Sequence, residues 1–216
     1  MDSHAQQPTA PPEASSAETA PPKDRDVREI LPSPAPCPPS SRGGKARFVT
    51  RNYEIADGRL HDDVRIAVVS DLHGAAYGED QRELTAALER ERPHAVLLLG
   101  DIFDQRGMGE HSKTLVRAVS RRFGCYFILG NHEHKSGELD RIRAFLREEG
   151  VPVLAGDMAT IRVNGTRVQL FGIDDGHGGK AEQLRQIADA AGKRSDEVYS
   201  ILAIHVPTGV TSCLRC

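Results

Sequence analysis

Tryptophan is absent from this 216-residue sequence, and cysteine is scarce, with only four residues spread between Cys37 and Cys216. So few cysteines at such irregular spacing exclude a disulfide-rich scaffold. No run approaches the roughly 18 apolar residues that a membrane helix requires, and the N-terminus lacks the apolar core of a signal peptide. These absences predict a cytoplasmic protein without a membrane span, and they leave peripheral membrane association open.

An excess of charge is also missing, because 28 basic residues face 31 acidic ones and the formal net charge is −3. No extended basic block is present. Proteins that bind nucleic acid or anionic membranes by electrostatic capture carry such blocks. We therefore expect no nucleic-acid partner, and small or neutral partners fit the sequence better.

The composition changes near residue 46. Residues 1–46 contain most of the 13 prolines, mixed with Ala, Ser and Glu, and show no apolar periodicity. Such a segment cannot bury enough apolar surface to offset the entropy of ordering, so we expect a disordered Pro/Ala-rich leader. Residues 47–216 hold apolar runs and helical stripes, which predict one globular domain.

Within that domain, buried-strand patterns alternate with amphipathic helical patterns. Asn164 and Gly165 lie between two alternating runs, which is the strongest short signal of a β-hairpin. Alternating strands and helices predict a layered α/β sandwich with mixed sheets. The predicted strands cover 48–55, 64–70, 95–100, 125–129 and 199–204, with the hairpin around 164–165, and the predicted helices lie at 81–92, 115–119, 139–146 and 184–191.

Residues able to bind metals or move protons directly follow the buried strands. Ligand sites of open α/β sheets lie beyond the carboxyl ends of the strands, so these residues should converge in space although they are far apart in sequence. The set consists of Asp71 and His73 after 64–70, Asp101 after 95–100, Asn131 and His132 after 125–129, and His205 after 199–204.

Carboxylate, imidazole and amide oxygen together suit divalent Mn, Fe or Zn, and no cysteine lies at these strand ends. Asp71 and His73 are spaced to hold one ion. Asp101 can bridge to a second ion, which Asn131 and His205 would complete. Two ions about 3.5–4 Å apart can activate a shared water and clamp a phosphate, which is the chemistry of phosphoester hydrolysis.

These residues also carry a family resemblance. Four short motifs resemble, in order, motif blocks of the calcineurin-like metallophosphoesterases. They are Asp71-x-His73, Gly100-Asp101, Gly130-Asn131-His132-Glu133 and His205. The resemblance covers roughly residues 48–205, and the runs SDLHG, GDIFD and GNHEH are similar to a bacterial branch whose members are often tethered beside a membrane.

The resemblance implies a binuclear centre that hydrolyses phosphomonoesters or phosphodiesters through a metal-bridging hydroxide. It implies that His132 is the catalytic imidazole, which protonates the leaving alkoxide or steadies the phosphate. The substrate would be a small-molecule or lipid phosphoester, whose identity depends on loops rather than on metal ligands.

One block of the family pattern is missing. The family completes its site with a Gly-x-His-x-His run, whereas the residues after His205 contain no histidine. We therefore expect a domain truncated at its C-terminus, without its last strands and with one ligand missing from each metal. The alternative to an active enzyme is a catalytically inactive remnant.

Several further residues have simpler interpretations. We expect Glu133 and His134 to make local hydrogen bonds rather than to bind metal. Asp174 and Asp175 read as a loop turn, with a substrate-facing role left open. The Cys213-x-x-Cys216 pair lacks the second ligand pair that a zinc knuckle needs.

Overall fold

The computed structural model describes residues 47–176, 179–191 and 198–208. The predicted Pro/Ala-rich leader and the Cys213-x-x-Cys216 pair lie outside these residues. The described elements are β1 (Ile66–Val69), η1 (Glu79–Gln81), α1 (Arg82–Glu91), β2 (Ala95–Leu99), α2 (Glu110–Ser120), β3 (Gly124–Ile128), α3 (Asn131–Lys135), α4 (Leu139–Glu148), β4 (Met158–Val163), β5 (Thr166–Ile173), α5 (Lys180–Ala191) and β6 (Tyr199–Ile204).

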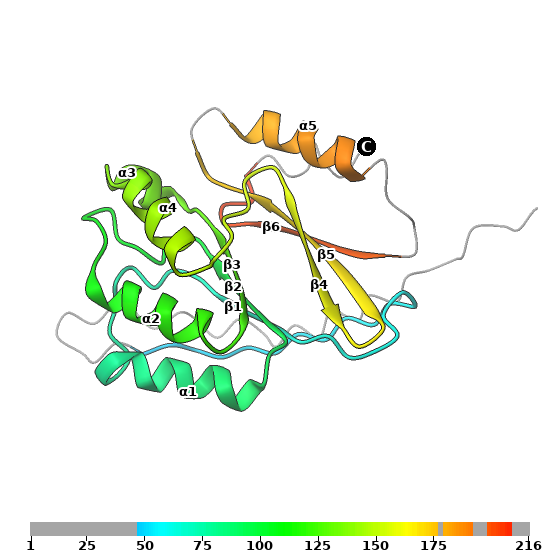
Figure 1. Cartoon of the computed structure of the whole chain (residues 1–216), viewed down its shortest axis with the longest axis horizontal. Helices are drawn as coiled ribbons and strands as arrows, with labels where there is room; N and C mark the ends of the chain where they lie inside the picture. Colours follow the sequence, from blue (N-terminus) through cyan, green and yellow to red (C-terminus); the bar gives the residue numbers. More distant parts are fainter. Residues whose placement is uncertain (1–46, 177–178, 192–197, 209–216) are drawn as a thin grey trace, which may run out of the picture.

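The first sheet is parallel, with strand order β1-β2-β3. Helices α1 and α2 make the crossovers, and they bury their apolar stripes together with α4 against one face of the sheet (Figure 1). In α1 the buried stripe consists of Leu84, Ala87 and Leu88, as the helical periodicity predicts. Because all three strands run the same way, their carboxyl ends share one edge of the sheet.

The second sheet is mixed, with order β4-β5-β6. Strands β4 and β5 form the predicted antiparallel hairpin, and its turn holds Asn164 at φ 49°. Strand β6 then pairs parallel to β5. A second apolar core, which includes Leu97, Ile128 and Leu170, fills the space between the two sheets. With α5 against the outer side of the second sheet, the layers run helices, sheet, sheet, helix (Figure 1).

The layered α/β sandwich with mixed strand pairing is therefore confirmed, and so are the four long helices. The predicted strand at 48–55 is wrong. Of its apolar side chains only Phe48 reaches the core, where it packs edge-to-face on Tyr77 at 5.3 Å between ring centroids. Residues 49–56 are exposed, and no described strand pairs with them, so the segment stays extended without joining a sheet.

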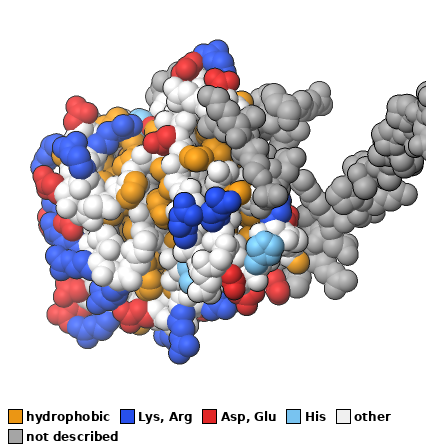
Figure 2. Space-filling view, turned by 45° about the vertical axis from the view of Figure 1, so that its right-hand side comes forward, with side chains coloured by type: hydrophobic (Ala, Val, Ile, Leu, Met, Phe, Trp, Pro, Cys, Tyr) orange, Lys and Arg blue, Asp and Glu red, His pale blue; other side chains and the backbone are white. Residues whose placement is uncertain are grey.

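The surface mixes both signs of charge. On the face drawn in Figure 2, acidic and basic side chains are interspersed among apolar and uncharged ones. Among the described residues, no helix combines the length and the apolar character needed to cross a bilayer.

Candidate metal centre

Four of the five predicted ligands, Asp71, His73, Asp101 and His205, come together where strands of both sheets end. The loop after β1 runs beside the loop after β2, with the Asp71 N–H donating to the Gly100 carbonyl at 3.2 Å and the His73 N–H to the Asp101 carbonyl at 2.9 Å. His205, directly after β6, lies over Gly100 so closely that an added Cβ would stand 2.4 Å from its ring. Only glycine fits there, because its missing side chain leaves the space for the imidazole.

Three of these ligands have an unusual backbone. Asp71, His73 and Asp101 have φ values of 57°, 48° and 55°, in the left-handed region that residues with a Cβ rarely adopt. Each such residue costs on the order of 1–3 kcal/mol, and such strain clusters at functional sites. The strain turns the chain sharply at the strand ends and directs the side chains toward one another.

Asp101 lies at the middle of the cluster and is 4% exposed. Its Oδ1 accepts the backbone N–H of His132 at 2.9 Å. Its Oδ2 faces three imidazole nitrogens, the Nε2 atoms of His205 at 3.2 Å and of His73 and His132 at 3.9 Å each. One carboxylate oxygen therefore anchors the side chain, and the other faces the three surrounding imidazoles.

His205 is held in one orientation. Its Nδ1 lies 2.9 Å from the Leu99 carbonyl oxygen, which accepts a hydrogen from that nitrogen and leaves Nε2 directed at Asp101. Burial lowers the pKa of His205, but the negative charges of Asp101 and Asp71 and the hydrogen bond to Leu99 outweigh it, so the pKa is raised overall. A divalent cation would take the place of that proton in the same negative surroundings.

The donors fit divalent metals in two overlapping groups, each with its ligand atoms within 4.8 Å of one another. His73, Asp101 and His132 form one group, and Asp71, Asp101 and His205 form the other. The buried Nδ1 atoms of His73 and His132 have no hydrogen-bond partner among the described residues. His73 and His132 thus each direct Nε2 at a shared carboxylate and leave Nδ1 without a partner, which suits a metal centre better than a structural network.

The grouping differs from the sequence-based allocation of ligands, which placed Asp71 with His73. In the structure His73 lies close to both candidates, with its Nε2 3.7 Å from Asp71 Oδ1 and its ring centroid 4.4 Å from that of His132. Asn131 is the first residue of α3 and is half-buried, between Gly130 and His132. Which residue binds which ion stays a prediction.

Glu133 organises the backbone around the centre, as its predicted local hydrogen bonding requires. Its carboxylate is fully buried and accepts the N–H groups of Asp101, Phe103 and Gly130, each at 2.9 Å. Burial raises its pKa although these donors lower it. Glu133 thus ties the exit of β2 to the start of α3 and takes no direct part among the ligands.

Asp174, just after β5, belongs to an internal polar cluster. Its carboxylate accepts the Gln183 amide at 2.7 Å and lies 3.2 Å from Arg143 and 3.5 Å from Nε2 of His134. Burial raises its pKa, but the nearby His134 imidazole and the hydrogen bonds from Gln183 and the Gly176 N–H together lower the pKa to about 2. Asp174 therefore links α4, α5 and the α3 histidine as a buried anion.

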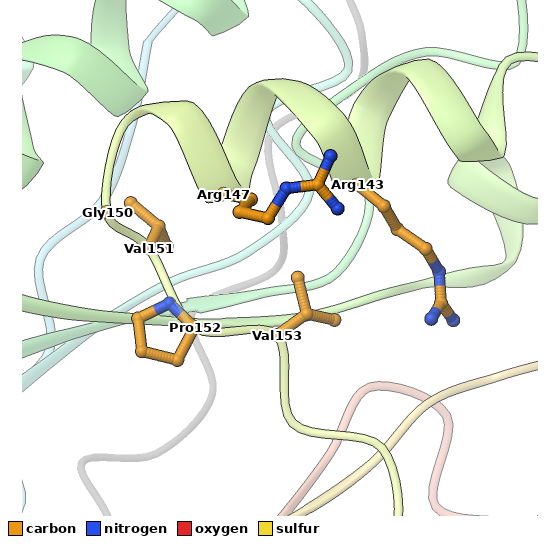
Figure 3. Close-up of a pocket in the computed structure, with 6 residues that line it drawn as sticks. All are labelled: Arg143, Arg147, Gly150, Val151, Pro152 and Val153. Carbon is orange, nitrogen blue, oxygen red and sulfur yellow. The ribbon is translucent and has the colours of Figure 1, made fainter.

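A groove of about 440 Å³ lies beside α4, away from these ligands (Figure 3). None of the predicted site residues lines it. Its walls are Arg143, Arg147, Gly150, Val151, Pro152 and Val153.

Sequence reasoning missed Ser70. Its hydroxyl donates to Asp71 Oδ2 at 2.5 Å and lies 3.4 Å from Nδ1 of His205. The only signal available was its position between a buried strand and the first ligand, which is typical of many serines without function.

Comparison with known proteins agrees with this geometry. The family model described as calcineurin-like phosphoesterase matches residues 64–211. The chain belongs to the calcineurin-like phosphoesterase family. A curated relative from Caenorhabditis elegans, named "Putative metallophosphoesterase F40B5.2", is 29% identical over 160 residues, which are 67% of this chain and 31% of that protein.

This chain thus spans about a third of the length of that relative. Among solved structures, the phosphopantetheinyl hydrolase PptH from Mycobacterium tuberculosis aligns with a TM-score of 0.40 at 18% identity, over 72% of this chain and 61% of that one.

Proposed function

We propose that this calcineurin-like phosphoesterase domain is a metal-dependent hydrolase of phosphomonoesters or phosphodiesters. The observation that supports this most directly is Asp101, whose Oδ2 is buried and faces the Nε2 atoms of three histidines from three different strand ends. The proposed metal ligands are Asp71, His73, Asp101, Asn131 and His205, with two divalent ions of Mn, Fe or Zn as the expected cofactors.

Asp101 and His132 have different roles in the proposed reaction. Bound divalent ions would supply Lewis acidity and lower the pKa of a water. The Asp101 Oδ1 holds the His132 backbone, and the His132 side chain is 25% exposed, so its imidazole can reach a substrate while staying fixed. His132 is then placed to hold a proton at its ring nitrogen and deliver it to the departing alkoxide.

The substrate class is a small-molecule or lipid phosphoester. The exposed Asp71 opens the centre to solvent, whereas Asp101 is buried beneath it, so a phosphate can approach from the Asp71 side. The runs SDLHG, GDIFD and GNHEH are similar to the bacterial branch whose members are often tethered beside a membrane, so lipid phosphoesters are among the candidate substrates. A cytoplasmic location with peripheral membrane contact is consistent with such a substrate.

The test uses the full chain, stripped of metal and supplied in turn with Mn²⁺, Fe²⁺ or Zn²⁺. We expect release of p-nitrophenol from p-nitrophenyl phosphate or its bis ester with at least one metal. Asp101→Asn should lose both metal and turnover because the shared ligand is weakened. His132→Ala should lower kcat by about 10²–10⁴-fold, the usual contribution of a general acid. His111→Ala, an exposed histidine on α2, is the matched control.

Absence of turnover with every metal and both esters would contradict the enzymatic proposal and favour the inactive remnant. The remnant predicts less than one metal per chain. Elemental analysis of the reconstituted protein therefore separates the two hypotheses, and two bound metals per chain would rule out the remnant as described.

A further inference from the structure

Asp175 stands beside the metal centre without being one of its predicted ligands. Its side chain is 2% exposed, although a carboxylate is costly to bury. Its backbone N–H donates to the Leu129 carbonyl at 3.0 Å, which fixes the residue to the exit of β3 in the first sheet. Because Asp175 follows β5 of the second sheet, it lies where the two sheets meet.

The carboxylate reaches the segment after β6 together with Lys180, the first residue of α5. Asp175 Oδ2 accepts the Val206 N–H at 3.1 Å, and Lys180 Nζ donates to the Val206 carbonyl at 3.1 Å. Lys180 Nζ and Asp175 Oδ1 are 2.5 Å apart. One ion pair, with Asp175 buried and Lys180 28% exposed, thus binds both the N–H and the carbonyl of Val206. We call Asp175, Lys180 and Val206 the Val206 clamp.

The clamped residue directly follows His205. The His205 ring has little freedom on its other side, where Nδ1 bonds to Leu99 and the ring packs on Gly100. A ring held this closely needs its backbone in one place, since a displacement of about 1 Å is enough to spoil a metal or catalytic geometry. The clamp supplies that second restraint.

Stability alone is a poor reason for such a pair. Replacing a buried ion pair with apolar side chains is often neutral or stabilising, because desolvating two charges offsets their attraction. Here a buried Asp175 and a partly exposed Lys180 hold the residue next to a proposed metal ligand, and positioning explains that arrangement better than stability does. In metalloproteins generally, side chains that hydrogen-bond to a metal ligand fix the orientation of that ligand.

We propose that Asp175, neutralised by Lys180, is a positioning residue that fixes the backbone of His205 and thereby sets the direction of its imidazole. The expected effect on metal affinity rests on the proposed function. The positioning of His205 does not, because it can be observed in the metal-free protein.

The experiment compares Asp175→Ala and Asp175→Asn in the full chain. In metal-free protein, NMR is expected to show faster Val206 amide exchange and a changed His205 ring tautomer in Asp175→Ala. Calorimetric titration with Mn²⁺ or Zn²⁺ is expected to show affinity weakened by about 10–100-fold, the usual effect of losing such an outer group. Asp175→Asn keeps an acceptor for Val206, so it should recover part of both readouts.

Asp62→Ala is the matched control. Asp62 likewise joins distant segments by accepting the Gly165 N–H at 3.3 Å and the Thr166 hydroxyl at 3.2 Å, but at the opposite end of β5. We expect it to lower stability without moving the His205 signals or the metal affinity.

Unchanged His205 signals in both Asp175 variants would overturn the proposal, and so would an equal loss of affinity in Asp62→Ala. If Asp175→Ala does not fold, the His205 and Val206 signals of Asp175→Asn test the proposal instead. A third result is possible, in which the wild-type protein binds no metal but the His205 signals still change in the variants. That result would overturn the proposed function and support the positioning role.

Discussion

Glu133 and Asp174 are both buried carboxylates, yet their pKa values move in opposite directions. Burial raises the pKa of Glu133, and its backbone N–H donors do not fully offset that effect. For Asp174 the donors include His134 and Gln183, and they outweigh burial, so the pKa lies at about 2. At the scale of single residues, the partner groups rather than the residue type decide how a carboxylate behaves.

The pKa of Asp174 leads to a prediction about acid stability. A carboxyl with a folded pKa of about 2 and an unfolded pKa near its ordinary value of 3.8 stabilises the fold above pH 4. That contribution is lost as the pH falls toward 2. Asp174→Asn should therefore lower the free energy of unfolding at pH 7 by about 2 kcal/mol, since one pKa unit corresponds to about 1.4 kcal/mol.

Urea unfolding at pH 7 and pH 3 measures this effect. The deficit of Asp174→Asn should be smaller at pH 3 than at pH 7. Asp63→Asn, at an exposed aspartate, should match wild type at both values. An equal deficit at the two pH values would show that the stabilisation does not depend on the charge of Asp174.

At the scale of elements, periodic segments were predictable and short ones were not. The stripes of α1, α2 and α4 lie in the sequence itself, so burial follows the helical period. The five-residue α3 has no such stripe. Its start depends on Glu133 accepting the Gly130 N–H while also binding Asp101 and Phe103 from another loop.

The junction between β3 and α3 leads to a second prediction. A Cβ at Gly130 would stand 2.3 Å from Asp101 Oδ1 and 2.6 Å from the Asp101 backbone nitrogen. Gly130→Ala must therefore displace Asp101, the proposed shared ligand. We expect a loss of about 1–3 kcal/mol, which is typical of overpacking, together with weaker metal binding.

Thermal unfolding and calorimetric titration of Gly130→Ala measure the two effects. Gly58→Ala is the control, because an added Cβ there meets no atom within 4 Å. Metal affinity equal to wild type in Gly130→Ala would mean that Asp101 tolerates the displacement and that the contact is not restrictive.

At the scale of the whole molecule, the site belongs to neither sheet alone. Asp71 and Asp101 follow strands of the first sheet, whereas His205 follows β6 of the second. The apolar core between the sheets, with Leu97 and Leu170, brings these strand ends into contact. The proposed ligands are therefore close only in the folded chain.

Metal should for this reason stabilise the fold. A ligand that binds only the native state at 100 times its Kd adds about 2.7 kcal/mol per site. We expect Mn²⁺ or Zn²⁺ to raise the Tm and a chelator to reverse the increase. Asp101→Asn should show little response. A Tm of wild type that does not depend on metal concentration would contradict native-state binding at these strand ends.

The sequence by itself determined the α/β class, the family and the strand-end location of the proposed ligands, because hydrophobic period and short motifs are local properties. Tertiary structure alone decided the left-handed backbone of Asp71, His73 and Asp101, the shared oxygen of Asp101 and the Val206 clamp. These features depend on contacts between residues distant in the chain, and no local pattern encodes such contacts. The same reason explains why residues 48–55 read as a strand in the sequence yet belong to neither described sheet, since pairing depends on a partner strand and not only on a local pattern.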